Sequence, residues 1–160
     1  MKTVFVLFCI LFSGALQAQP AQQKFDKSAF YKALASDDID QITAQIDLLE
    51  KHASPEKTAY EGALLMRKAG LVKNVSNKLS LFKSGRLKLE KAISEDTTNT
   101  EFRFLRLLIQ ENAPAILHYR SDLKTDSQHI KASFKSLPTV VQRVISAYSK
   151  KSKVLHSADY

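Results

Sequence analysis

The chain has 160 residues, of which 44% are hydrophobic and only four are Gly and four are Pro, so its composition excludes a disordered chain. Lys and Arg number 24 against 16 Asp and Glu, which gives a formal net charge of +8. A single cysteine excludes an internal disulfide framework, and the length suits one domain.

Residues 1–18 predict a signal peptide. A lysine near the start is followed by a short apolar run over residues 4–12, and small residues lead to a cleavage site after Ala18, with Ala15 as the alternative. The run is shorter than the ~20 apolar residues of a transmembrane helix, so we expect an exported protein, periplasmic or secreted, rather than an anchored one. Cys9 lies inside the run without small residues before it, which argues against lipid modification.

The mature chain is expected to consist of a disordered polar leader, residues 19–25, and an all-α domain, residues 26–155. Strands are not expected, because the sequence has no Asn-Gly or Asp-Gly hairpin signal and no sustained alternation of apolar and polar residues. About seven helices are predicted, joined by short links that favour antiparallel packing. Without Lys2 the net charge of the mature chain is +7.

Three helices are predicted in the first half. Asp26 or Ser28 can cap the first helix, and a strict three-four spacing marks the second. The apolar positions of these two helices are Phe30, Tyr31, Leu34, Ile39, Ile42, Ile46 and Leu49. Ser54-Pro55-Glu56 predicts the start of the third helix, which ends at Gly70 and is followed by a connector over residues 71–76.

The bulkiest apolar residues of the second half gather in residues 79–112, which predict a helix, a polar turn and a second helix. Gly85 lies on the apolar stripe of the first of these helices. Glycine costs roughly 1 kcal/mol against alanine there, so we expect a neighbouring helix to approach closely. Asn99 or Thr100 can cap the second helix, and Pro114 ends it. Four apolar residues form its face: Phe102, Leu105, Leu108 and Ile109. Phe104 and Leu107 widen this face, which predicts burial on two sides.

The segment Ala92-Ile93-Ser94-Glu95-Asp96-Thr97-Thr98-Asn99 resembles the junction between tetratricopeptide repeats, which usually reads Ala-Ile-x-x-Asp-Pro-x-Asn. The resemblance extends from Gly85, where the family has a small residue, to Ile109, although Thr97 replaces the family's proline. It implies antiparallel helix pairs and a protein-interaction role without catalysis. The leader, in which Ala18-Gln19 precedes a Gln-rich stretch, separately resembles those of exported Bacteroidota proteins, which include a small helical group.

After Pro114 the sequence predicts a short helical turn over residues 115–119 and two more helices. Thr125-Asp126-Ser127-Gln128 resembles a capping box that opens the first of them, and Pro138 opens the last. Residues 156–160 are expected to fray.

Two clusters in this half could bind a ligand. His118, Asp122, Asp126 and His129 would share one helical stripe, but a cap at Thr125 would break it, so no metal site is predicted. Arg103, Arg106 and Gln110 stand in the most apolar helix and are the predicted ligand-binding residues, for an acidic ligand. The alternative is structural, since long Arg stems often cover apolar surface while the guanidinium pairs with an acid.

Residues 67–91 hold eight basic side chains against one acid, Glu90. The predicted basic surface consists of Arg67, Lys68, Lys83, Arg86, Lys88 and Lys91, and the segment also contains Lys73 and Lys78. Such charge density attracts acidic partners or anionic envelope surfaces, whereas an ordinary solvated surface is the alternative. Export argues against nucleic acid as the partner.

Catalytic signatures are missing, including Gly-x-Ser-x-Gly, His-Glu-x-x-His and a phosphate loop. The prediction is therefore an exported, non-enzymatic helical domain that binds another exported or envelope protein, without a cofactor. The alternatives are an enzyme built from scattered residues of a helical bundle and a binder of anionic surfaces through residues 67–91. An exposed apolar groove would favour the binder, and a polar pocket would favour the enzyme.

Overall fold

A computed structural model describes residues 25–51 and 54–156, which are helical and contain no strand. It has seven α-helices, as expected, and two short 3₁₀ turns. They are α1 (Lys27–Ala35), α2 (Ile39–Lys51), α3 (Lys57–Leu71), α4 (Val75–Glu95), α5 (Thr100–Asn112), η1 (Ala115–Leu117), α6 (Leu123–Ser133), η2 (Phe134–Ser136) and α7 (Thr139–Ser149). The all-α class is confirmed. The predicted signal peptide, almost all of the leader and the last four residues lie outside the described residues.

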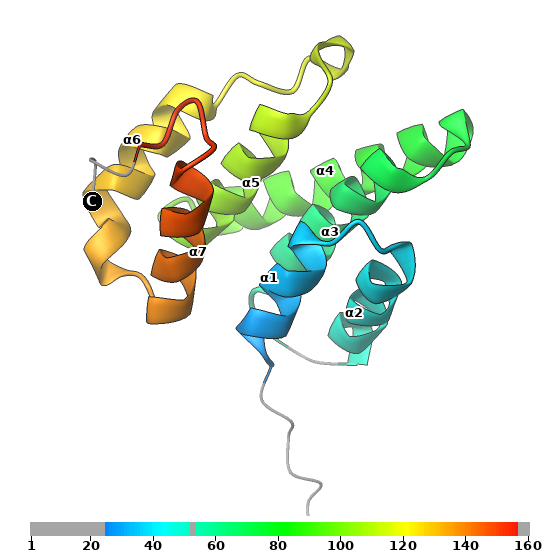
Figure 1. Ribbon diagram of the computed structural model, residues 1–160, viewed down its shortest axis with the longest axis horizontal. Helices are drawn as coiled ribbons and strands as arrows, with labels where there is room; N and C mark the ends of the chain where they lie inside the picture. Colours follow the sequence, from blue (N-terminus) through cyan, green and yellow to red (C-terminus); the bar gives the residue numbers. More distant parts are fainter. Residues whose placement is uncertain (1–24, 52–53, 157–160) are drawn as a thin grey trace, which may run out of the picture.

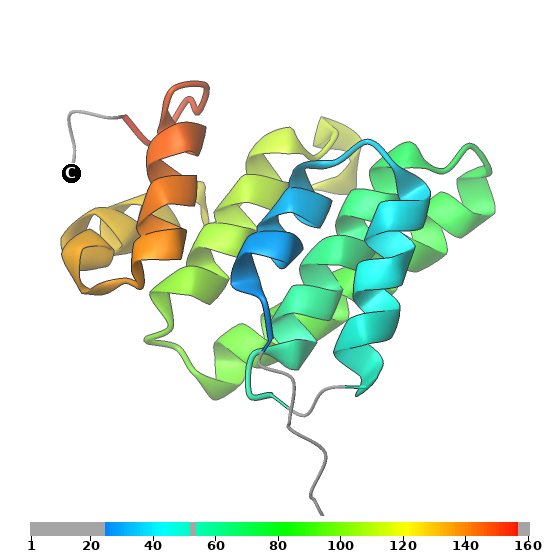
Figure 2. The ribbon, with the colours of Figure 1, turned by 60° about the horizontal axis from the view of Figure 1, so that its bottom comes forward.

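The helices pack around α3 and α5. Figure 1 shows α5 between the α6–α7 pair and the group formed by α1 to α4. In Figure 2, α1 and α2 (blue and cyan) lie on one side of α3, and α4 (green) lies on the other. The three-residue link between α3 and α4 makes them an antiparallel hairpin, which is the most extensive helix contact of the described chain.

The α3–α4 hairpin depends on two glycines. A Cβ built on Gly85 would lie 2.6 Å from the carbonyl oxygen of Gly62 and 2.9 Å from the backbone nitrogen of Met66. A Cβ on Gly62 would likewise lie 2.7 Å from the carbonyl oxygen of Gly85. These distances leave no room for a side chain, so the predicted close approach at Gly85 is confirmed.

Side-chain caps fix four helix starts, including that of α2, where Asp38 accepts from the backbone N–H groups of Asp40 and Gln41. The carboxylate of Asp26 accepts hydrogen bonds from the backbone N–H groups of Ser28 and Ala29 at 2.8 and 3.2 Å. Asn74 and Asn99 cap α4 and α5 in the same way, by accepting from the residue three positions later. The predicted caps at Asp26 and Asn99 are confirmed.

Other predicted boundaries are wrong. The connector after α3 covers only residues 72–74, because α3 extends to Leu71 and α4 starts at Val75, so five positions outside the predicted helices are helical. Pro55 and Glu56 form a turn closed by the hydrogen bond from Lys57 N–H to the Ser54 carbonyl at 3.2 Å, so α3 starts after them. The Ser54 hydroxyl is buried without a hydrogen-bond partner and caps nothing.

The predicted capping box at residues 125–128 is also wrong. Helix α6 starts at Leu123, so Thr125 lies inside its first turn. The physical reason is that the Asp126 side chain is completely buried against α5, where charged partners hold it. By contrast, the prediction that α5 is buried on two sides is confirmed, because Phe102, Leu105 and Phe104 with Leu107 are all nearly inaccessible to solvent.

Candidate functional site

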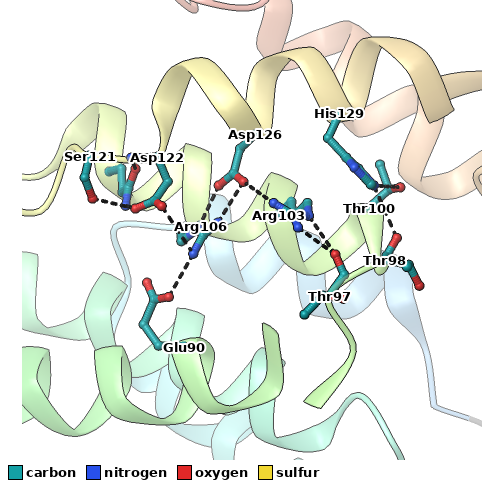
Figure 3. A network of polar contacts seen from close by, with 11 residues as sticks. Glu90, Thr97, Thr98, Thr100, Arg103, Arg106, Ser121, Asp122, Asp126 and His129 are labelled. Carbon is teal, nitrogen blue, oxygen red and sulfur yellow. Dashed lines mark hydrogen bonds and ion pairs between the residues drawn. The ribbon is translucent and has the colours of Figure 1, made fainter. Parts of the chain in front are cut away.

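A buried ion-pair network joins α5 to α6 and contains the predicted ligand-binding arginines (Figure 3). Asp126 accepts from Nε and Nη2 of Arg106 at 2.7 and 2.8 Å, a two-pronged contact with one guanidinium. It also accepts from Nη1 of Arg103 at 3.0 Å. The same Arg103 side chain donates to the carbonyl of Thr97 at 2.6 and 3.0 Å, which ties the α4–α5 turn to the network.

Arg106 also connects the network to α4. Its Nη1 donates to Glu90 at 2.9 Å, and the other oxygen of Glu90 accepts from the Tyr119 hydroxyl at 2.5 Å. Burial alone would lower the pKa of Arg106, but its bonds to Asp126 and the charge of Glu90 reverse this and raise it. The Arg106 guanidinium is therefore a permanent positive charge shared between carboxylates from two helices.

Gln110 contacts the start of α6. Its amide donates to Asp122 at 2.9 Å and accepts from the Asp122 backbone N–H at 3.3 Å. Burial would raise the pKa of Asp122, but hydrogen bonds from Ser121 and Gln110 and the charge of Arg106 lower it. The structure thus brings Arg103, Arg106 and Gln110 together, and their polar atoms face acceptors of the protein itself. Binding of an acidic ligand by these three residues stays a prediction.

The two histidines of the rejected metal stripe have different surroundings. His118 follows η1 in the left-handed conformation, at φ 45°. His129 Nε2 lies 3.1 Å from the Thr100 hydroxyl (Figure 3). Asp126 belongs to the arginine network, and residues 25–51 and 54–156 contain no group of three or more His, Cys, Asp or Glu side chains suited to a metal.

Sequence reasoning missed a second buried carboxylate, Glu101. Its oxygens accept from the hydroxyls of Tyr31 and Tyr60 at 2.9 and 2.8 Å and from Lys27 Nζ at 2.7 Å. Burial and the adjacent negative charge raise the pKa of both tyrosines, so they stay neutral donors. Nothing in the sequence links Glu101 to these tyrosines, which lie more than 40 positions away.

The basic surface is divided among several partners. Arg67 pairs with Asp37, Lys88 with Glu61 at 3.1 Å, and Lys91 with Glu95 at 3.7 Å. Lys68 donates to the Thr43 hydroxyl at 2.8 Å, and the Arg86 guanidinium lies 4.6 Å from the centre of the Tyr119 ring. Lys83 is exposed on α4. These six residues therefore do not form one uninterrupted positive face, and their role in binding stays a prediction.

The structure also contains an apolar groove of about 1030 Å³, to which no sequence signal pointed. It is open to solvent on one side and is enclosed by the ends of α1, α3, α5 and α7, the first turns of α4, and η1. Figure 1 shows the connection between α3 and α4 and the end of α5 with η1 projecting on the same side of the molecule. Of its 23 lining residues, only Asp37, Arg67, Lys78, Asn112 and Lys151 carry a charged or amide side chain.

Large apolar side chains are exposed along this groove. Val75 is 78% exposed, Leu79 45% and Ile116 82%, and all three line the groove. They make up three of the five large exposed hydrophobic side chains of the described residues, the others being Leu48 and Leu87. Clustered apolar exposure of this kind marks a binding surface, whereas single exposed residues do not.

Comparisons with known proteins leave the family open. No family model matches the chain, and no curated protein or solved structure gave a significant match. The tetratricopeptide and Bacteroidota resemblances therefore stay predictions. Within the part of the chain that the structure describes, none of the helices is both long enough and apolar enough to span a bilayer.

Proposed function

We propose that this protein is an exported, non-enzymatic binding domain that holds an apolar segment of another protein in the groove between α1, α4, α5 and α7. One observation carries the proposal: a half-open cavity of about 1030 Å³ that is lined mainly by apolar side chains and bordered by the exposed Val75, Leu79 and Ile116. The predicted signal peptide in residues 1–18 supports export.

The character of the lining favours binding over catalysis. Catalytic sites place a few polar groups that converge on a reacting atom, whereas several polar side chains of this groove are bonded to one another, as Asn112 is to the Tyr148 hydroxyl at 2.9 Å. Asp37, its only acid, is already paired with Arg67. Covering a large apolar side chain stabilises a complex by about 1.5–3 kcal/mol, so burial of three such residues supplies a useful part of the binding free energy.

A fluorescent model peptide tests the proposal. The peptide carries Leu at helical three-four spacing and an uncharged Gln face, and its binding to the purified protein is followed by anisotropy. We expect saturable binding that Leu79→Asp and Ile116→Asp each weaken by about tenfold or more, because a buried aspartate replaces a covered apolar side chain.

Leu87→Asp is the matched control, since Leu87 is 73% exposed on α4 and does not line the groove. Circular dichroism of all three variants checks that the fold is retained. Equal weakening by Leu87→Asp, or no binding of the peptide to the unmodified protein, would contradict the proposed function.

A further inference from the structure

The groove offers almost no hydrogen-bond partners for a peptide backbone. Of its lining side chains only five are charged or amide groups, and the described chain has no strand edge that an extended peptide could join. An extended segment would leave its N–H and C=O groups unpaired against apolar side chains, which costs free energy for each group. A helix satisfies its own backbone, so the groove favours a helical occupant.

The position of the exposed residues argues against an acyl chain. A single alkyl chain would lie along the floor of the groove, whereas Val75 and Ile116 remain 78% and 82% exposed at its border. An α-helix is about 10 Å wide with its side chains and would cover both the floor and the border. Apolar anchors at three-four spacing on one face of such a helix would meet Leu79 and these two residues.

Two lysines at the groove indicate the charge of the partner's polar face. Lys78 and Lys151 line it, and none of the ion pairs within the described residues involves either of them. Lys151 Nζ lies 5.5 Å from the ring centre of Tyr148, which also lines the groove. Lys78 is on the exposed first turns of α4, next to Leu79.

We infer that the occupant is an acidic amphipathic helix of the partner protein, with apolar anchors in the groove and carboxylates directed toward Lys78 and Lys151. The inference rests on the proposed function and adds the shape and charge of the ligand. Complementary charge at the border selects among apolar helices, because a basic helix would place like charges together.

Three fluorescent peptides of about 18 residues, roughly five helical turns, test this inference. All carry the same Leu face, and their polar faces consist of Glu, Gln or Lys. A covalent staple holds each peptide helical, so that helix propensity does not differ among them. A fourth peptide has the Glu sequence with a proline at its centre and no staple, which prevents a continuous helix.

We expect the stapled Glu peptide to bind about tenfold tighter than the Gln peptide and the Lys peptide to bind weakest. Raising the salt concentration from about 0.05 M to 0.5 M should weaken the Glu peptide but leave the Gln peptide nearly unchanged. The double variant Lys78→Glu/Lys151→Glu should reverse the order of the Glu and Lys peptides. Lys83→Glu, at an exposed position of α4 that does not line the groove, should preserve the order.

Several results would overturn the inference. If the Glu, Gln and Lys peptides bind equally and only Leu79→Asp weakens their binding, the partner helix is not selected for acidic residues, while the proposed function is retained. Tighter binding of the proline peptide would exclude a helix. If palmitate displaces the Glu peptide at a concentration lower than that of the peptide, the groove binds an acyl chain. If light scattering shows that the protein dimerises and that the dimer does not bind the Glu peptide, the groove is occupied by a second copy. No binding of any peptide would reject the proposed function itself.

Discussion

Single residues in this protein join helices that are distant in the sequence. Asp126 is completely buried, and it accepts hydrogen bonds from two arginines of α5. The two arginines were recognisable from the sequence as charges in an apolar helix, and one interpretation there was structural pairing. Their partner was not recognisable, because the ion pairs cross 20 and 23 positions and the sequence around Asp126 resembles a capping box.

Replacing Asp126 tests how much this network stabilises the fold. Asp126→Ala leaves Arg106 buried without its main counterion, and removing one partner of a buried pair costs about 3–5 kcal/mol. We therefore expect a large decrease in the free energy of unfolding, measured by urea denaturation. The control Glu95→Ala breaks the exposed Lys91–Glu95 pair and should change the same quantity by no more than about 0.5 kcal/mol. Similar effects of the two variants would show that the network contributes little.

At the scale of elements, the α3–α4 hairpin depends on the Gly62–Gly85 crossing. Gly85→Ala places a Cβ 2.6 Å from the carbonyl oxygen of Gly62, and a backbone atom cannot yield as a flexible side chain does. We expect a loss of about 1–3 kcal/mol in the free energy of unfolding, even though alanine is the better helix former. Gly85→Leu should cost at least as much.

Gly70→Ala is the matched control for this prediction. Gly70 lies in α3, like Gly62, but a Cβ built on Gly70 meets nothing within 4 Å. Alanine should therefore be neutral or stabilise the protein by up to about 1 kcal/mol, through helix propensity and reduced freedom of the unfolded chain. If Gly85→Ala is as stable as Gly70→Ala, the two helices do not cross as closely as described.

The sequence predicted buried elements better than exposed ones. Helices α2 and α5 bury one face or more, so their apolar periodicity is strong and their positions were predicted correctly. Residues 75–78, which form the start of α4, are all exposed, and therefore no buried stripe marked them as helical. That missed segment includes Val75 and Lys78, so the error in the helix boundary also concealed part of one wall of the groove.

For the whole molecule, the fold class was predictable and the groove was not. Composition, helical spacing and caps were enough to predict an all-α domain of about seven helices. The groove is assembled from the ends of several helices, and residues such as Phe82, Leu108 and Val144 look like ordinary core positions in the sequence. Only their arrangement in space separates a lining residue from a core residue.

The whole molecule also holds four tyrosine hydroxyls against carboxylates. Tyr31 and Tyr60 donate to Glu101, Tyr119 donates to Glu90, and Tyr148 donates to Glu111 at 2.9 Å. Burial, together with these carboxylates, raises the pKa of all four tyrosines. The sequence contains one further tyrosine, Tyr160, which lies outside the described residues.

These raised pKa values predict alkaline instability. Unfolded tyrosines lose their protons near pH 10, whereas the folded protein keeps these four protonated, so above that pH the unfolded state binds fewer protons and becomes favoured. The stabilisation is fully present below about pH 10 and should decrease as the pH rises further, which urea denaturation at a series of pH values measures.

Tyrosinate absorbance supplies an independent readout: the four buried tyrosines should ionise together with unfolding and not before it. Tyr60→Phe removes one of them, so it should make the decrease in stability with pH less steep, whereas gradual ionisation of four or five tyrosines in the folded protein would contradict the described carboxylate contacts.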